Sequence, residues 1–184
     1  TGAMGIDVYP HLEPTVALVT STTDGWVRKV DLGSNSVIEM IQLKQLTFLT
    51  PTAGSGTASI LAGSSSDGEQ DARGTSASFD NPRGIAIDPS GTYALVVDHY
   101  NHLIRKIMLD TKEVTTLAGD GTSTIFNYPN GIAIHPTENY AVVADSGNHR
   151  IRKIELATGD VTTLAGSGYK YWTETATGTS AHFN

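Results

Sequence analysis

Short apolar runs, separated by clusters of Gly, Pro, Asn and Asp, follow one another along most of the chain. Between residues 126 and 168 the runs cover 131–134, 140–144, 150–156 and 161–164. Runs of this length, rich in Val, Ile, Leu and Thr and bounded by turn residues, predict β-strands. They are too short and too often interrupted for helices. The apolar residues are nearly continuous within each run, which is typical of sheets that are covered on both faces.

The same pattern occurs twice with a fixed period. Residues 83–119 and 130–166 align without a gap, and equivalent residues lie 47 positions apart. The equivalent pairs include Gly84 with Gly131, Asp98 with Asp145, Asn101 with Asn148, Arg105 with Arg152 and Gly119 with Gly166. A period of this length indicates a repeat architecture whose units stack and bury one another. We therefore predict an all-β fold built from four-stranded antiparallel blades of a β-propeller.

The repeat predicts a single propeller segment over 1–184 with about three blades. Blade 1 is assigned to 1–66 with an insertion at 32–58, blade 2 to 79–120, blade 3 to 126–168, and a connector to a further blade to 169–184. Residues 176–184 resemble the connector text at 72–80, so a fourth unit would begin where the sequence stops. Because propellers typically have about 4 to 8 blades, we expect further blades of the same polypeptide or a second chain to complete the ring.

Three sequence motifs within each unit resemble those of a known family. The first is Phe126-Asn127 followed by Pro129 and Gly131, the second is Asn148-His149-Arg150-Ile151, and the third is Val161-Thr162-Thr163-Leu164-Ala165-Gly166. This text resembles the NHL repeat, strongly over 79–184 and weakly over 1–31. The resemblance implies blades around a central axis, with binding of protein, RNA or small molecules on one face. It also implies a setting like that of large secreted or surface proteins, so we expect an extracellular or cell-surface location, with the cytoplasm as the alternative.

Charge and composition narrow the classes of partner. The chain has 12 Lys and Arg against 19 Asp and Glu, a net charge of -7, which argues against nucleic-acid binding and against docking on anionic membranes. No apolar run is long enough for membrane insertion. The absence of cysteine excludes disulfides, thiolate metal sites and Cys nucleophiles. The frequent Ser and Thr residues suit strands and turns, and glycan attachment to surface hydroxyls is an alternative.

The polar residues that recur with the period are interpreted as structural. A catalytic residue is normally unique, whereas Asp98 and Asn101 have copies at the same turn, where Asp and Asn side chains bond backbone amides. The repeated Arg105 and Arg152 predict ion pairs between blades. We therefore predict no enzyme, no catalytic residue and no cofactor.

A metal site in the channel is the alternative. His135 and Asp88 occupy equivalent positions at the end of the first strand of their units, and Asp7 is the acidic residue on the first strand of the first unit. A zinc site needs about three converging ligands. Because some related propellers are lyases or lactonases that hold zinc or calcium in the channel, the resemblance implies that such an activity would use these residues.

The candidate interaction surface consists of residues that break the period. Three lie in the last connector and three in the insertion: Tyr169, Tyr171, Trp172, Met40, Ile41 and Phe48. Exposed aromatic side chains favour contacts with other molecules, and an extra edge strand either packs on its own chain or pairs with a partner. The function predicted is a non-enzymatic interaction or structural scaffold. Its expected partners are proteins, by self-association or through further blades, in an extracellular or filamentous assembly.

Overall fold

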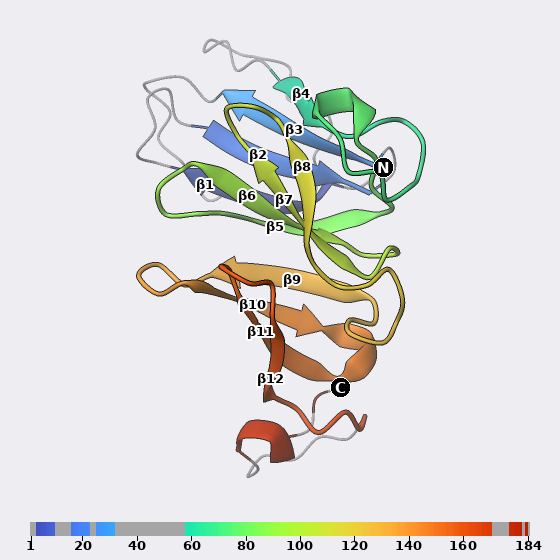
Figure 1. The fold of residues 1–184 in the computed structure, drawn as a ribbon, viewed down its shortest axis with the longest axis vertical. Helices are drawn as coiled ribbons and strands as arrows, with labels where there is room; N and C mark the ends of the chain where they lie inside the picture. The colour runs from blue at the N-terminus through green and yellow to red at the C-terminus, as the bar shows by residue number, and fades with distance from the viewer. Residues whose placement is uncertain are drawn as a thin grey trace.

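Three four-stranded antiparallel sheets make up the fold in the computed structural model (Figure 1). The structure describes residues 3–9, 16–22, 25–31, 58–170, 177–181 and 183. These residues contain strands and one-turn 3-10 segments, and no helix among them has the length and apolar character needed to cross a membrane. The all-β propeller-blade fold predicted from the sequence is confirmed.

Within each sheet, every strand pairs with the one before it in the chain. The first sheet holds β1 (Ala3–Tyr9), β2 (Val16–Ser21), β3 (Trp26–Asp31) and β4 (Ala58–Ala62). The second holds β5 (Pro82–Ile87), β6 (Tyr93–Asp98), β7 (Leu103–Met108) and β8 (Val114–Ala118). The third holds β9 (Pro129–Ile134), β10 (Tyr140–Asp145), β11 (Arg150–Glu155) and β12 (Val161–Ala165). Three 3-10 turns are η1 (Gly74–Ser76), η2 (Ser146–Asn148) and η3 (Gly178–Ser180). We refer to the three sheets as blades 1, 2 and 3.

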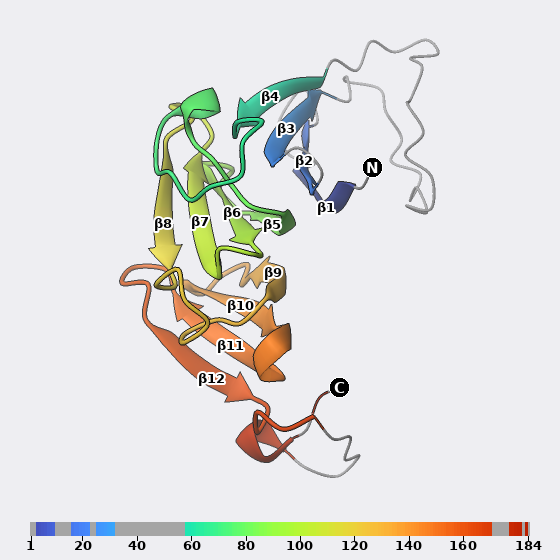
Figure 2. The ribbon, with the colours of Figure 1, turned by 90° about the vertical axis from the view of Figure 1, so that its right-hand side faces the viewer.

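The blades lie side by side along an arc (Figure 2). Their first strands are neighbours, because β1 contacts β5 and β5 contacts β9. These strands line the concave side of the arc, and β4, β8 and β12 lie on the outside. The turns between second and third strands, and the connectors between blades, share one edge of the arc. We call this the connector edge.

The two clear copies fold in the same register. Asp98 pairs with Leu103 across the β6–β7 turn, as Asp145 pairs with Arg150 across the β10–β11 turn. The third and fourth strands of all three blades share an irregularity directly before the recurring arginine, at Val27/Arg28, Ile104/Arg105 and Ile151/Arg152. Bulges of this kind re-aim a side chain, and here they turn the arginine toward the connector edge.

Two apolar cores lie between the blades. The first joins Leu18, Val27 and Leu61 of blade 1 to the face of blade 2 that holds Ile85 and Val96. The second joins the opposite face of blade 2 to blade 3, through Leu95, Val97, Ile104, Ala118, Ala141, Val143 and Ile154. Blade 2 is therefore buried on both faces, which is the physical reason for the nearly continuous apolar runs in its sequence. The insertion predicted at 32–58 lies outside the described residues except for Ala58, which begins β4.

Candidate functional site

The recurring aspartate of blade 2 is a buried hydrogen-bond acceptor. Asp98 Oδ1 accepts from the backbone N–H of Asp80 at 2.8 Å. Its Oδ2 accepts from Asn101 Nδ2 at 2.9 Å and from Arg105 Nη1 at 2.8 Å. Burial raises the pKa of Asp98 to about 6, although the three donors favour the ionised form. The carboxylate thus joins the start of the blade to its second turn.

Blade 3 repeats this arrangement. Asp145 accepts from the backbone N–H of Asn127 at 2.7 Å and from Asn148 Nδ2 at 2.8 Å. Its ion pair is longer, with 3.6 Å between Arg152 Nη1 and Asp145 Oδ2. Because the backbone and asparagine donors bind the same carboxylate atoms in both copies, these residues hold the blade together.

Arg105 binds the connector that leads into its blade. Its side chain is fully buried, and Nη2 lies 2.5 Å from Asp71 Oδ1. Nη1 also donates to the backbone oxygen of Ser78 at 3.1 Å, and the guanidinium lies over the ring of Phe79. Asp71 in turn accepts from the backbone N–H of Thr116 at 2.9 Å. The connector from blade 1 is therefore fixed to blade 2 by a charged network as well as by apolar packing.

The metal-site candidates serve as acceptors in turns. Asp88 accepts from the backbone N–H groups of Ser90, Thr92 and Tyr93 at 3.0, 2.7 and 2.8 Å. Burial opposes its ionisation, but these bonds and the Ser90 hydroxyl together lower the pKa of Asp88. At the equivalent turn of blade 3, His135 Nδ1 accepts from the backbone N–H of Glu138 at 2.9 Å.

No group of three or more His, Asp, Glu or Cys side chains that could hold a metal ion occurs among the residues that the structure describes. The side chain of Asp7 lies outside them. The structure therefore assigns Asp88 and His135 to turn formation and does not bring them together as ligands.

One member of the candidate interaction surface is placed by the structure. Tyr169 is 66% exposed, and its backbone N–H donates to Ser167 Oγ at 3.2 Å. The other five, Tyr171, Trp172, Met40, Ile41 and Phe48, lie outside the described residues.

Blade 3 has a face that no other blade covers among the described residues, and this face is the counterpart of two covered ones. The residues of blade 2 that face blade 3 include Leu95, Val97, Ile104, Leu117 and Ala118. Adding the repeat period gives their counterparts in blade 3, which are Val142, Ala144, Ile151, Leu164 and Ala165. We call these five residues the open face. Leu164 is 50% exposed, whereas the equivalent Leu61 at the interface of blades 1 and 2 is 3% exposed.

A hollow of about 350 Å³ lies beside the open face. It is lined by residues that include Ala144, His149, Arg150, Ile151 and Phe183. In blade 2, residues at the start of blade 3 fill the equivalent place. There the Tyr128 N–H donates to His102 Nδ1 at 3.0 Å. The hollow thus has the position that the start of a following blade would occupy.

The last connector has the conformation of the first. The backbone N–H of Gly166 donates to Gly178 O at 3.1 Å, as that of Gly63 donates to Gly74 O at 3.1 Å. In the first connector, Ala72 O accepts from the backbone N–H of Val114 at 2.9 Å, so this segment binds the outer strand of the blade that follows. The last connector presents the same backbone shape beside the open face.

One surface cluster was missed by the sequence analysis. Tyr100 and Tyr128 are 49% and 47% exposed, and their ring centroids lie 6.0 Å apart on the connector edge. Tyr100 stands where the copy has Gly147. A comparison of the two copies for aromatic residues that break the period would have found it.

The comparisons with known proteins agree with these observations. Residues 126–154 match the family model described as NHL repeat. NHL repeat-containing protein 2 of Gallus gallus is 46% identical over 57 residues, which cover 31% of this chain and 8% of that protein.

Solved structures share the fold. One, in a nidogen–laminin complex, has a TM-score of 0.57 at 16% identity, over 89% of this chain and 48% of that one. Another, an auxiliary nutrient binding protein of Bacteroides thetaiotaomicron, has a TM-score of 0.60 at 22% identity, over 86% of this chain and 37% of that one. The chain thus spans less than half of either structure. Residues 126–154 thus match the NHL repeat model, and the three sheets have the fold of β-propeller blades.

Proposed function

We propose that the chain is a non-enzymatic protein-interaction scaffold whose open face receives a further blade of the same kind. The single observation that carries the proposal is the match between the open face and two covered faces of the same molecule. Val142, Ile151 and Leu164 repeat the apolar positions through which blades 1 and 2 each bury the next blade. In both covered cases the partner surface is a face of the next blade. For blade 1 this is the blade 2 face that holds Ile85 and Val96, so we expect the equivalent face of a further blade to cover the open face.

The last connector supports the same occupant. Its backbone repeats the bond between Gly63 and Gly74 that accompanies docking of the first connector on blade 2. Phe183 lies against Gly166, as Phe79 lies against Gly63. The segment is therefore pre-organised to continue into a blade seated on the open face, which reduces the entropic cost of docking. The next blade can come from the same polypeptide or from a second copy.

The non-enzymatic part of the proposal is supported by the use of the polar residues. Asp98, Asp145, Asp88 and His135 each accept backbone N–H groups that fold the blade. Their side chains are committed to structure rather than aimed at a shared point. We place the assembly at the cell surface or outside the cell, in line with the large secreted proteins that the repeat text resembles.

Native mass spectrometry of the purified chain tests the docking. The wild type is expected to form species larger than one chain, and Leu164→Arg is expected to remain a single chain, because it places a charge in the apolar contact. Thr137→Arg is the matched control, since it adds the same charge to an exposed turn at the opposite edge of blade 3. A wild type that stays a folded single chain at every concentration, and takes up no chain carrying further blades, would overturn the proposal.

A further inference from the structure

Two exposed tyrosines meet at the junction between blades 2 and 3. The described residues include four large apolar side chains that are strongly exposed, namely Tyr100, Tyr128, Leu164 and Tyr169. The first two form one cluster, with their rings edge to face. The ring of His102 lies 4.8 Å from that of Tyr128, also edge to face. We call Tyr100, Tyr128 and His102 the aromatic patch.

The patch is held rigidly by the backbone. The Tyr100 N–H donates to Asp80 O at 3.2 Å, and the Tyr128 N–H donates to His102 Nδ1 at 3.0 Å. Beneath them the buried ring of His99 bonds Pro129 O through Nδ1 at 2.7 Å. The two tyrosine rings therefore extend from fixed positions, so a ligand meets a preformed surface.

Tyr128 occupies a strained backbone conformation. Its φ is 48°, in the left-handed region, and the equivalent residue before blade 2 is Asn81 with φ 54°. Asn adopts this region readily, whereas a bulky aromatic residue does so at a cost of order 1 kcal/mol or more. Tyr128 is 47% exposed, so core packing does not explain the choice of residue. Tyr128 therefore keeps a strained backbone while its ring is exposed, which indicates that the ring serves to bind another molecule.

The surroundings of the patch are acidic. Asp120 is close enough to His102 to interact electrostatically with it, and Glu69 lies beside Gly121 of the same connector. The positive charge of Arg83 acts on the buried His99 beneath the patch, and its guanidinium donates to the side-chain oxygens of Asn81 and Asn130 at 3.2 and 3.0 Å.

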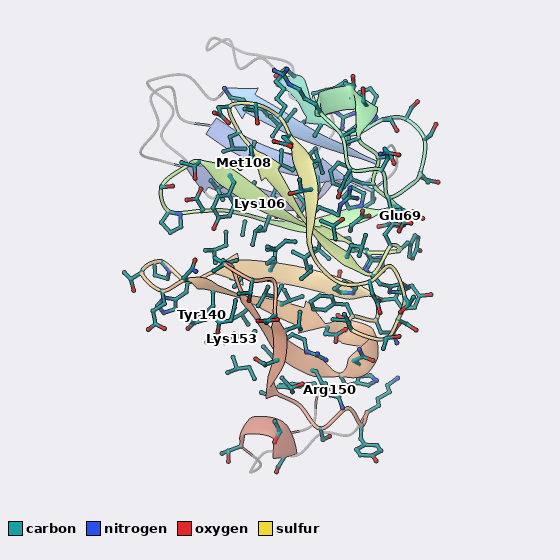
Figure 3. All side chains as sticks on the ribbon, in the orientation of Figure 1. Glu69, Lys106, Met108, Tyr140, Arg150 and Lys153 are labelled. Atoms are coloured by element: carbon teal, nitrogen blue, oxygen red, sulfur yellow. The ribbon has the colours of Figure 1, made fainter. Side chains whose placement is uncertain are left out.

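Two lysines, Lys106 of blade 2 and Lys153 of blade 3, lie elsewhere (Figure 3). Figure 3 shows Glu69 on the connector edge, with Lys106 and Lys153 toward the opposite edge. Those two lysines each lie over a tyrosine of their own blade, with 4.2 Å from Lys106 Nζ to the centroid of the Tyr93 ring and 4.6 Å from Lys153 Nζ to that of Tyr140. The chain thus already pairs an ammonium group with a tyrosine at two equivalent positions.

We propose that the aromatic patch binds a cationic side chain, arginine or lysine, of a partner polypeptide. The faces of aromatic rings attract cations, and the carboxylates of Asp120 and Glu69 add an attraction of the same sign. A phosphate backbone would meet repulsion at the same place. The site is separate from the open face, because it lies at a junction that blades 2 and 3 have already closed.

Fluorescence anisotropy with a labelled hexa-arginine peptide tests the site on the full chain. Tyr128→Asn, which installs the residue of the equivalent position, is expected to weaken binding by about threefold to thirtyfold, the range of one cation–π contact. Tyr128→Phe keeps the ring and is expected to bind like the wild type. Tyr169→Asn removes an exposed tyrosine outside the patch and is the matched control. Glu69→Gln is expected to weaken binding and to reduce its dependence on salt.

Three results would overturn the proposal. Equal binding by the wild type and Tyr128→Asn would place the cation elsewhere on the acidic surface. Equal losses in Tyr128→Asn and Tyr169→Asn would show a general surface effect. Binding of a neutral maltooligosaccharide that is lost in Tyr128→Asn, with no binding of hexa-arginine, would make the patch a sugar site. None of these results bears on docking at the open face, which Leu164→Arg tests separately.

Discussion

Ile104 and Ile151 are the same residue at the same repeat position, yet blade 3 covers only the first. Ile104 is fully buried and packs in the core between blades 2 and 3, whereas Ile151 is half-buried on the open face. Substitution by alanine removes three carbon atoms, worth roughly 2.4 kcal/mol of burial at about 0.8 kcal/mol each. The cavity left behind adds to this, so we expect Ile104→Ala to lower the free energy of unfolding by about 3 to 4 kcal/mol.

Ile151→Ala creates no enclosed cavity and gives up less burial, so we expect a loss of about 1 kcal/mol. Urea unfolding, followed by tyrosine and tryptophan fluorescence at a concentration where the protein is a single chain, measures both values. The matched positions remove differences in strand pairing, because Ile104 and Ile151 lie at the same bulge opposite Ala118 and Ala165. Equal losses in the two variants would refute the reasoning, since they would mean that blade 3 does not cover Ile104.

The remaining predictions concern single groups. Asp98→Ala removes the fully buried one of the two carboxylates that bind Arg105 and should cost about 3 to 5 kcal/mol in urea unfolding, more than Asp145→Ala, whose ion pair is longer. Tyr128→Asn should raise the free energy of unfolding by about 1 kcal/mol, because it relieves the left-handed strain; a lower value would show that the ring stabilises the fold. Burial lowers the pKa of His99, with smaller effects of Arg83 and His102, so its contribution to stability is present above a pH of about 6.5 and is lost as the pH falls. The loss of stability between about pH 7.5 and 5.5 should therefore be smaller in His99→Ser. Elemental analysis of the purified protein should find no stoichiometric zinc or calcium, and a bound metal would favour the channel-site alternative.

The strands could be predicted because the sequence contains two copies of the repeat, and equivalent residues of the two copies can be compared. A residue type that recurs at the same point of two units, such as Asp98 and Asp145, is explained by the fold that both units share. The four strands of the third unit were predicted to within two residues of their observed ends. The structural role of the recurring aspartates was also predictable, since Asp and Asn are the usual acceptors in such turns.

The open face could not be predicted from the local sequence. Leu117 and Leu164 lie in two copies of the same motif, Val-Thr-Thr-Leu-Ala-Gly. Leu117 packs against a neighbouring blade, whereas Leu164 is half exposed. Exposure here depends on the stacking of whole blades rather than on the residues beside the leucine.

The turn contacts and the aromatic patch were likewise hidden from the sequence. Asp88 and His135 each accept backbone N–H groups of their own turn, and the position of a residue at the end of a first strand does not reveal these bonds. The patch depends on the left-handed backbone of Tyr128, which brings two residues of different blades together.

Cysteine labelling at Leu164 tests most directly whether the open face receives another blade. The natural sequence contains no cysteine, so Leu164→Cys, Tyr169→Cys and Leu61→Cys each report on one position through their rate of reaction with a maleimide. In the single chain, Leu164→Cys should react much faster than the buried Leu61→Cys. As the protein concentration rises, or when a chain with further blades is added, its rate should fall toward that of Leu61→Cys while Tyr169→Cys stays fast. A rate at Leu164→Cys that stays high under all these conditions would contradict the account.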